Sequence, residues 1–237
     1  MILLAIDTTA VSASAALMRD GKVIASLHSE AGAARGELLL PMIESCLSVS
    51  HLTFGDIDAY ACTNGPGSFT GVRIGVATVK GLAFGKDLPC VPVSTLEAIA
   101  ENLRPLRGVY CAAMDARRGE VYTALFDTDE EGNLRRLTAD EAIPVSLLAE
   151  RVRPYLDGRP VFAAGDGAHV AKKALKDADI LCEETPALLS MQTASSVARV
   201  AQAALLRGFS LDCTKLSPIY LRVPQAERER LAKQTEA

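Results

Sequence analysis

Aromatic residues are scarce in this 237-residue chain, which has no tryptophan and only 5% aromatic residues in total. Surfaces that bind single-stranded nucleic acid usually stack bases on several aromatic rings, so the composition argues against a base-stacking platform. The formal net charge is −4 and the isoelectric point is about 5.5. This balance excludes a broad nucleic-acid-binding surface, although it leaves room for a local basic patch.

Metal-binding and disulfide motifs are also missing. The three histidines lie far apart and form no HxxxH or HExxH motif, and the six cysteines include no CxxC pair. We therefore expect no metal site and no cofactor, and we interpret the cysteines as buried free thiols in a reducing compartment. No apolar run is long enough to span a membrane, and residues 1–9 lack the basic start of a signal peptide. The sequence thus predicts a cytoplasmic protein with no membrane partner.

Hydrophobic residues make up 49% of the chain and charged residues 23%, which is enough to bury a sizeable core. Their spacing alternates between the two-residue period of strands and the 3.6-residue period of helices. In the first half, this pattern predicts strands at 1–6, 12–18 and 22–28, a helix at 37–50, a strand at 58–63, a helix at 68–84, a strand at 90–93 and a helix at 95–103.

The second half repeats this order of elements. It has predicted strands at 109–115, 120–126 and 134–143, a helix at 145–156, a strand at 161–164, a helix at 168–176, a strand at 180–182 and a helix at 192–207. Two βββαβαβα halves are the plan of the α/β actin-like ATPase (ASKHA) fold, whose lobes are ribonuclease H-like. We place an N-terminal lobe at 1–104, a C-terminal lobe at 105–223 and a charged, frayed tail at 224–237, and we expect the last helix to pack back on the first lobe.

One stretch, NGPGSFTGVRIG at residues 64–75, combines a tight glycine turn with the start of a helix. Ser68 is suited to cap this helix, whereas Gly71 and Gly75 weaken it and share one face. Three interpretations remain open: a phosphate-binding loop, an ordinary core helix, or a helix that another helix approaches closely. A phosphate loop is disfavoured because the stretch has neither a GKS or GKT sequence nor the GxGxxG fingerprint.

The same stretch resembles the signature of the bacterial TsaB family, also called YeaZ. Two further segments resemble motifs of this family: DARRGEVY at 115–122 and the PIYLR ending at 218–222. The resemblance implies a non-catalytic scaffold that forms a heterodimer with TsaD and, with it, binds the ATPase TsaE. TsaD transfers a threonylcarbamoyl group to the adenosine next to the anticodon in tRNAs that read ANN codons. The scaffold would meet tRNA only through this complex, and a homodimer is a further expected assembly.

The two helices predicted at 37–50 and 68–84 carry apolar residues on more than the one face that a sheet would cover. Surplus apolar surface of this kind marks an association site, and the resemblance implies a helical bundle with TsaD here. The predicted interface residues are Leu39, Met42, Cys46, Gly71, Val72, Gly75, Val76 and Lys80. We expect a bulky residue at Gly75 to abolish TsaD binding and to leave the fold intact.

Active members of the actin-like fold hold nucleotide phosphates and a metal with an aspartate after the first strand and with glycines in two hairpin loops. Asp7 and Asp115 stand at the matching positions here, but Thr8 and Arg118 belong to loops that lack those glycines. We expect these four residues to mark a vestigial nucleotide cleft, with Asp7 as a hydrogen-bonded structural acid and with no catalytic residue. The alternative is an actin-like ATP-dependent enzyme or a glycoprotein endopeptidase-like metallopeptidase.

Overall fold

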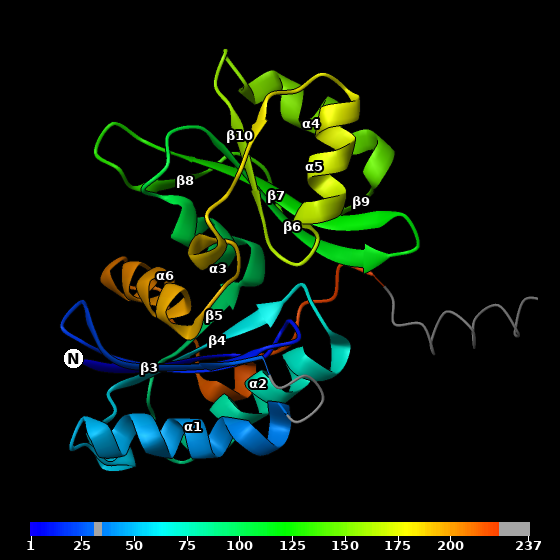
Figure 1. Cartoon of the computed structure of the whole chain (residues 1–237). Coiled ribbons are helices and arrows are strands. Elements are labelled where there is room, and N and C mark those ends of the chain that lie inside the picture. The colour runs from blue at the N-terminus through cyan, green and yellow to red at the C-terminus, as the bar shows by residue number, and fades with distance from the viewer. Residues whose placement is uncertain (31–34, 223–237) are drawn as a thin grey trace, which may run out of the picture.

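The computed structural model describes residues 1–30 and 35–222, which form two sheets with helices packed on their faces (Figure 1). The first sheet has the strand order β3-β2-β1-β4-β5, in which β1 pairs antiparallel with β2 and parallel with β4. Its strands are β1 (Ile2–Asp7), β2 (Ala13–Arg19), β3 (Lys22–Ser29), β4 (Ala59–Gly65) and β5 (Cys90–Ser94).

The second sheet repeats this arrangement with the order β11-β10-β6-β7-β8. Its strands are β6 (Val109–Arg117), β7 (Glu120–Thr128), β8 (Leu134–Arg136), β10 (Val161–Ala164) and β11 (Cys182–Glu183), while β9 (Glu141–Pro144) also pairs with β7. In each half, an antiparallel three-strand meander continues into parallel strands, so the predicted actin-like plan of two related lobes is confirmed.

One predicted strand, at 134–143, was wrong in its extent. The structure has two short strands there, and both pair with β7 at different points along it. Between these two strands the backbone pairing with β7 is interrupted, because the Thr138 hydroxyl, rather than a backbone carbonyl, accepts the N–H of Leu125 at 2.9 Å. An ion pair between Arg136 and Asp140 closes the excursion.

The described residues form six α-helices around the two sheets. They are α1 (Arg35–Val49), α2 (Phe69–Ala83), α3 (Thr95–Leu103), α4 (Leu148–Val152), α5 (Ala168–Asp177) and α6 (Ala194–Leu206), with 3₁₀ turns at Phe54–Asp56, Val145–Leu147, Arg153–Tyr155, Ala187–Leu189 and Cys213–Lys215. The single helix predicted at 145–156 is interrupted, because Pro154 has no N–H to continue the helical ladder. None of the helices in the described ranges has the length and apolar character that crossing a membrane requires.

The strands β1, β2 and β4 of the first sheet are buried on both faces, whereas the edge strand β3 is largely exposed. Leu4 and Ile6 of β1 belong to the apolar core under α1 and α2, whereas Leu3 and Ala5 belong to a second core under α6. Helices α1 and α2 therefore lie on one side of this sheet, and α6 lies on the other side, between the two lobes (Figure 1). The alternating side-chain direction of a strand is what separates the two cores.

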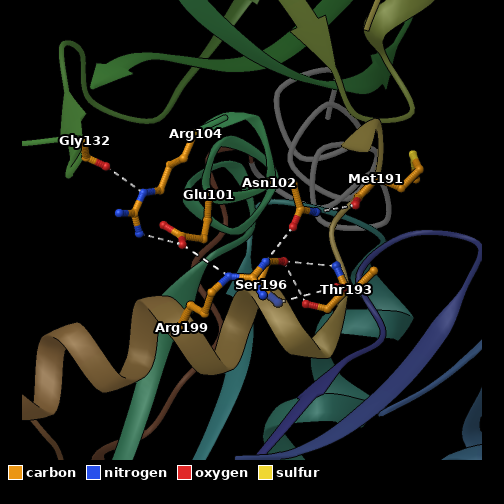
Figure 2. A network of polar contacts seen from close by, with 8 residues as sticks. All are labelled: Glu101, Asn102, Arg104, Gly132, Met191, Thr193, Ser196 and Arg199. Carbon is orange, nitrogen blue, oxygen red and sulfur yellow. Dashed lines mark hydrogen bonds and ion pairs between the residues drawn. The ribbon is translucent and has the colours of Figure 1, made fainter. Parts of the chain in front are cut away.

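A polar network joins α3 to α6 and to the second lobe (Figure 2). The carboxylate of Glu101 accepts hydrogen bonds from Arg104 at 3.1 Å and from Arg199 at 3.2 Å, and Arg104 also donates to the Gly132 carbonyl. Asn102 bridges Arg199 and the Met191 carbonyl. Burial raises the pKa of Glu101, while the two guanidinium groups oppose this rise. The network holds the α3–α6 layer to the turn between β7 and β8.

Candidate functional site

The glycine turn before α2 is held by a segment from the far end of the chain. Asn64 donates its side-chain amide to the Ser217 carbonyl at 3.1 Å, and its own carbonyl accepts the Ile219 N–H at 2.7 Å. Gly65 has a φ of +128°, and a Cβ there would collide with the Ile219 carbonyl. Glycine is thus required at this position by both the backbone conformation and the close approach.

The same C-terminal segment also reaches the second lobe. Arg222 donates to the Ala116 carbonyl at 2.9 Å and forms an ion pair with Glu120, at the β6–β7 hairpin. The three segments at 64–75, 115–122 and 217–222 therefore meet in space, although residues 76–114 separate the first from the second and residues 123–216 separate the second from the third. Sequence patterns alone did not indicate this convergence.

A cleft of about 560 Å³ opens where these segments meet. Its walls come from the loop after β1, the turn before α2, the β6–β7 hairpin, Asp166 and residues 219–222. Asp115 lines the cleft and accepts the backbone N–H of Arg117 at 2.7 Å, while its own N–H donates to Asp166 at 3.0 Å. Burial raises the pKa of Asp166. Each of these two carboxylates thus accepts a backbone N–H at the hairpin.

Asp7 lies apart from this cleft and is fully buried. Its Oδ1 atom accepts hydrogen bonds from the hydroxyls of Thr9 at 2.6 Å and Thr63 at 2.5 Å. Burial raises the pKa of Asp7, and these hydroxyl donors only partly oppose the rise. The arrangement agrees with a hydrogen-bonded structural acid. Asp7 does not itself line the cleft, because the Thr9 and Thr63 side chains enclose it, and a vestigial nucleotide cleft stays a prediction.

The other predicted cleft residues are also separated. Thr8 is buried beneath α2, where its hydroxyl donates to the Gly71 carbonyl at 2.6 Å, and Arg118 sits at the exposed tip of the β6–β7 hairpin. Of the four, only Asp115 lines the cleft. Across the described ranges, no three His, Cys, Asp or Glu side chains gather as a metal site requires.

Seven of the eight predicted interface residues form part of the chain's own interior. They are Leu39, Met42, Cys46, Gly71, Val72, Gly75 and Val76, all buried against the first sheet. The eighth, Lys80, donates its ammonium group to the carbonyls of Thr214 and Leu216. These side chains pack α1 against β2 and β3, and α2 against β4. A place for these residues at or near a partner interface stays a prediction.

The surroundings of Gly75 show that the glycine face of α2 points into the chain's own interior. A Cβ at this position would lie 3.0 Å from the Thr8 hydroxyl, which is closer than Cβ atoms normally approach. That hydroxyl cannot easily turn away, since it is bonded to the Gly71 carbonyl. Gly75 therefore makes room for Thr8 of this chain, and a bulky residue at Gly75 would disturb the fold itself.

A different set of residues faces outward from α1 and α2. Leu40, Val49 and Phe84 are 47, 71 and 76% exposed, and Phe69 is 38% exposed. Ala77 and Gly81 lie four residues apart on the exposed side of α2, and nothing lies within 4 Å of a Cβ built at Gly81. We call four of these residues the outer helix face: Leu40, Ala77, Gly81 and Phe84. In the sequence, this face is indicated by the apolar residues that remain on each helix once its buried stripe has been assigned.

Comparison with known proteins identifies the family of this chain. The chain is 34% identical over 225 residues to the tRNA threonylcarbamoyladenosine biosynthesis protein TsaB of Escherichia coli, with 94% of this chain and 95% of the relative covered. The chain belongs to the TsaB family. The Haemophilus influenzae TsaB is 31% identical, with 94% of each chain covered. A family model described as TsaD, tRNA N6-adenosine threonylcarbamoyltransferase, matches residues 28–230.

Solved structures agree with the TsaB assignment. A Pseudomonas aeruginosa protein described as similar to peptidase YeaZ superposes with a TM-score of 0.81 at 28% identity, covering 93% of this chain and 99% of that one. The YeaZ structure from the same organism superposes with a TM-score of 0.77 at 29% identity and the same coverage. The resemblance to the TsaB family predicted from the three motifs is therefore confirmed, and so is a role in tRNA threonylcarbamoyladenosine biosynthesis.

Proposed function

We propose that this TsaB-family chain is a non-catalytic subunit that binds TsaD through the outer helix face and, with TsaD, binds TsaE. In that assembly, TsaD transfers the threonylcarbamoyl group to the adenosine next to the anticodon of tRNAs that read ANN codons. The free cysteines fit a cytoplasmic location, because a reducing compartment keeps thiols from forming disulfides. Burial also raises the pKa of the Cys111 thiol to about 12.

The non-catalytic part of the proposal is supported by the two aspartates that an actin-like enzyme would use. Asp7 is enclosed by threonine hydroxyls, and Asp115 is engaged by the backbone of its own hairpin. The hairpin next to Asp115 carries Arg117 and Arg118 where glycines would leave space for phosphates. A nucleotide-dependent reaction would need both acids free to hold a metal and phosphate oxygens.

The outer helix face is the observation that carries the partner proposal. Its small residues, Ala77 and Gly81, allow another helix to approach α2 closely, and the exposed side chains of Leu40 and Phe84 offer further apolar contact. Ridge-into-groove packing of helices places interaxial distances at about 8–10 Å, with the shorter ones at small residues. Exposed apolar side chains beside small helical residues are a feature of association sites.

We expect Ala77→Arg to reduce recovery of co-expressed TsaD at least about tenfold, a loss of about 1.4 kcal/mol or more in binding free energy. The long charged side chain would prevent close helix approach at the middle of the face. The melting temperature should stay near that of the wild type, because Ala77 is exposed.

Ala203→Arg is the matched control, since Ala203 is an exposed helical alanine on α6, on the opposite side of the first sheet. It should leave TsaD recovery unchanged. Equal recovery of TsaD with Ala77→Arg and with wild type would reject the proposed face. Sedimentation of each variant without TsaD would show whether the same face also forms a homodimer.

A further inference from the structure

The tip of the β6–β7 hairpin holds two arginines in an unfavourable backbone conformation. Arg117 and Arg118 have φ values of +61° and +58°, followed by Gly119 at +76°. Since Arg117 pairs with Glu120, Arg118 and Gly119 form a two-residue turn with positive φ at both positions. Such turns favour Asn-Gly, and a left-handed residue with a longer side chain costs about 1 kcal/mol. A residue kept at this cost suggests a function for its side chain.

The guanidinium groups of Arg117 and Arg118 are also available to bind a ligand. Both arginines are exposed, and within residues 1–30 and 35–222 neither guanidinium forms an ion pair or hydrogen bond. Three carboxylates lie in the neighbourhood, and each has another bonding partner. Asp115 and Asp166 accept backbone N–H groups, and Glu120 is paired with Arg222. The hairpin tip therefore presents two guanidinium groups that have no side-chain partner among the described residues, at a cleft that Asp115 and Asp166 also line.

Two of the chain's few aromatic rings lie at the same cleft. The rings of Phe69 and Tyr220 are 5.0 Å apart between centroids, and both are 38% exposed. Arg73 stacks its guanidinium 3.8 Å from the Phe69 ring centre and donates to the Tyr220 hydroxyl at 2.9 Å, which fixes both rings. Phe69, Tyr220 and Arg117 all line the cleft. Positive charge and flat apolar rings thus share one opening.

We propose that this cleft mouth binds single-stranded RNA directly, with phosphates on Arg117 and Arg118 and a base stacked at the Phe69–Tyr220 pair. The inference rests on the proposed function for the choice of tRNA as the source of that RNA. Phosphates need cations, and unpaired bases need flat faces, so a single strand uses both features. An acidic protein segment would use the arginines and leave the rings without a role. The contact is a local patch, in keeping with the net charge of −4.

The test measures binding of the isolated full chain to a fluorescently labelled, unmodified anticodon stem-loop of a tRNA that reads ANN codons, over a range of salt concentrations. We expect Arg117→Ala with Arg118→Ala to weaken binding and to reduce the salt slope by about 1.4, about 0.7 for each phosphate contact on a single strand. The matched control is Arg107→Ala with Lys176→Ala, which removes two exposed positive charges outside the cleft and should change neither quantity.

A second variant separates binding from folding. Arg118→Asn should raise the melting temperature, because asparagine tolerates the left-handed turn, and should still weaken RNA binding. Three outcomes would overturn the proposal: no binding by the wild type at low salt, equal weakening in the control pair, or unchanged RNA binding with loss of TsaE recovery in the Arg117 and Arg118 variants. The last outcome would assign the tip to a protein partner. Ala77→Arg should leave RNA binding intact, so failure of the TsaD proposal is distinguishable.

Discussion

Gly75→Leu is expected to destabilise the fold by about 3 kcal/mol or more, at the upper end of what overpacking a core costs. The Cβ alone would lie 3.0 Å from the Thr8 hydroxyl, and the rest of the leucine would have to displace Thr8 or the end of β4. Folded domains have only about 5–15 kcal/mol to lose, so poor expression and a markedly lower melting temperature should follow. Chemical denaturation of the purified variant measures the change in the free energy of unfolding.

Gly81→Leu is the control on the same helix. Nothing lies within 4 Å of a Cβ at Gly81, so the leucine should enter without strain. Replacing a helical glycine removes a helix-propensity cost of about 1 kcal/mol, so this variant should be at least as stable as the wild type. It should nevertheless impair TsaD recovery, because Gly81 belongs to the outer helix face. Equal stability of the two leucine variants would contradict the assignment of Gly75 to the interior.

A double-mutant cycle with Thr8 refines the test. Thr8→Ala removes the hydroxyl that a Cβ at Gly75 would meet, and it also breaks the hydrogen bond to the Gly71 carbonyl. Gly75→Ala should therefore cost less in the Thr8→Ala background than in the wild type. Additive effects of the two changes would show that the glycine and the threonine do not share one space.

The regular elements were largely predictable because their signals are local. Ser68 is predicted to cap α2, and its hydroxyl does accept the backbone N–H three residues on. Ser94 caps α3 in the same way. Residues 134–143 were harder, because a side chain, Thr138, takes a ladder hydrogen bond in place of the backbone. A strand period continues through such a break, so the pattern could not reveal it.

The candidate site was predictable only in part, because it depends on which surfaces meet. Helical periodicity placed Gly71 and Gly75 on one face, but it could not say whether that face meets a partner or β1. In the structure, this face meets Thr8, which lies 63 positions before Gly71 in the sequence. The Thr8 hydroxyl fills the space beside Gly75. The meeting of residues 64, 116 and 222 is likewise a result of long-range topology, and the motifs carried no spacing rule that could predict it.

The predicted charged tail at 224–237 and the segment at 31–34 lie outside the described residues. The lobe boundaries at 104 and 105 stay a prediction, although α6 packs on the first sheet. A single boundary along the chain therefore separates α6 from the sheet that it covers. The apolar stripe of a helix does not by itself indicate which sheet the helix will pack against.

Asp7→Asn is expected to leave the protein folded and to make it more stable than the wild type at neutral pH. The wild-type carboxyl is fully buried, and its Oδ2 atom has no hydrogen-bond partner; neither does the buried Oε1 atom of Gln192. The Gln192 side chain lies beside this group and donates to Thr9 at 3.2 Å. Asparagine keeps the Oδ1 acceptor for Thr9 and Thr63, and its amide supplies a donor where the ionised carboxylate has none.

The pH dependence follows from the raised pKa of Asp7 in the folded state. Below the unfolded value of 3.8 the acid is protonated in both states, so its stabilising contribution is complete. As the pH rises from there through the folded-state pKa, the wild type loses about 1.4 kcal/mol for each pH unit, because only the unfolded state has released its proton. Asparagine does not titrate, so its advantage should grow over this range and then level off.

Unfolding free energies of both proteins, measured by denaturant titration from pH 4 to pH 8, provide the test. Asp7→Ala serves as the control, since it removes the acceptor for Thr9 and Thr63 as well as the charge and should be destabilising. A constant difference between wild type and Asp7→Asn across this pH range would contradict a raised pKa. A nucleotide-dependent enzyme would lose activity with the same substitution, whereas a structural acid predicts that reconstituted tRNA modification proceeds with Asp7→Asn as it does with the wild type.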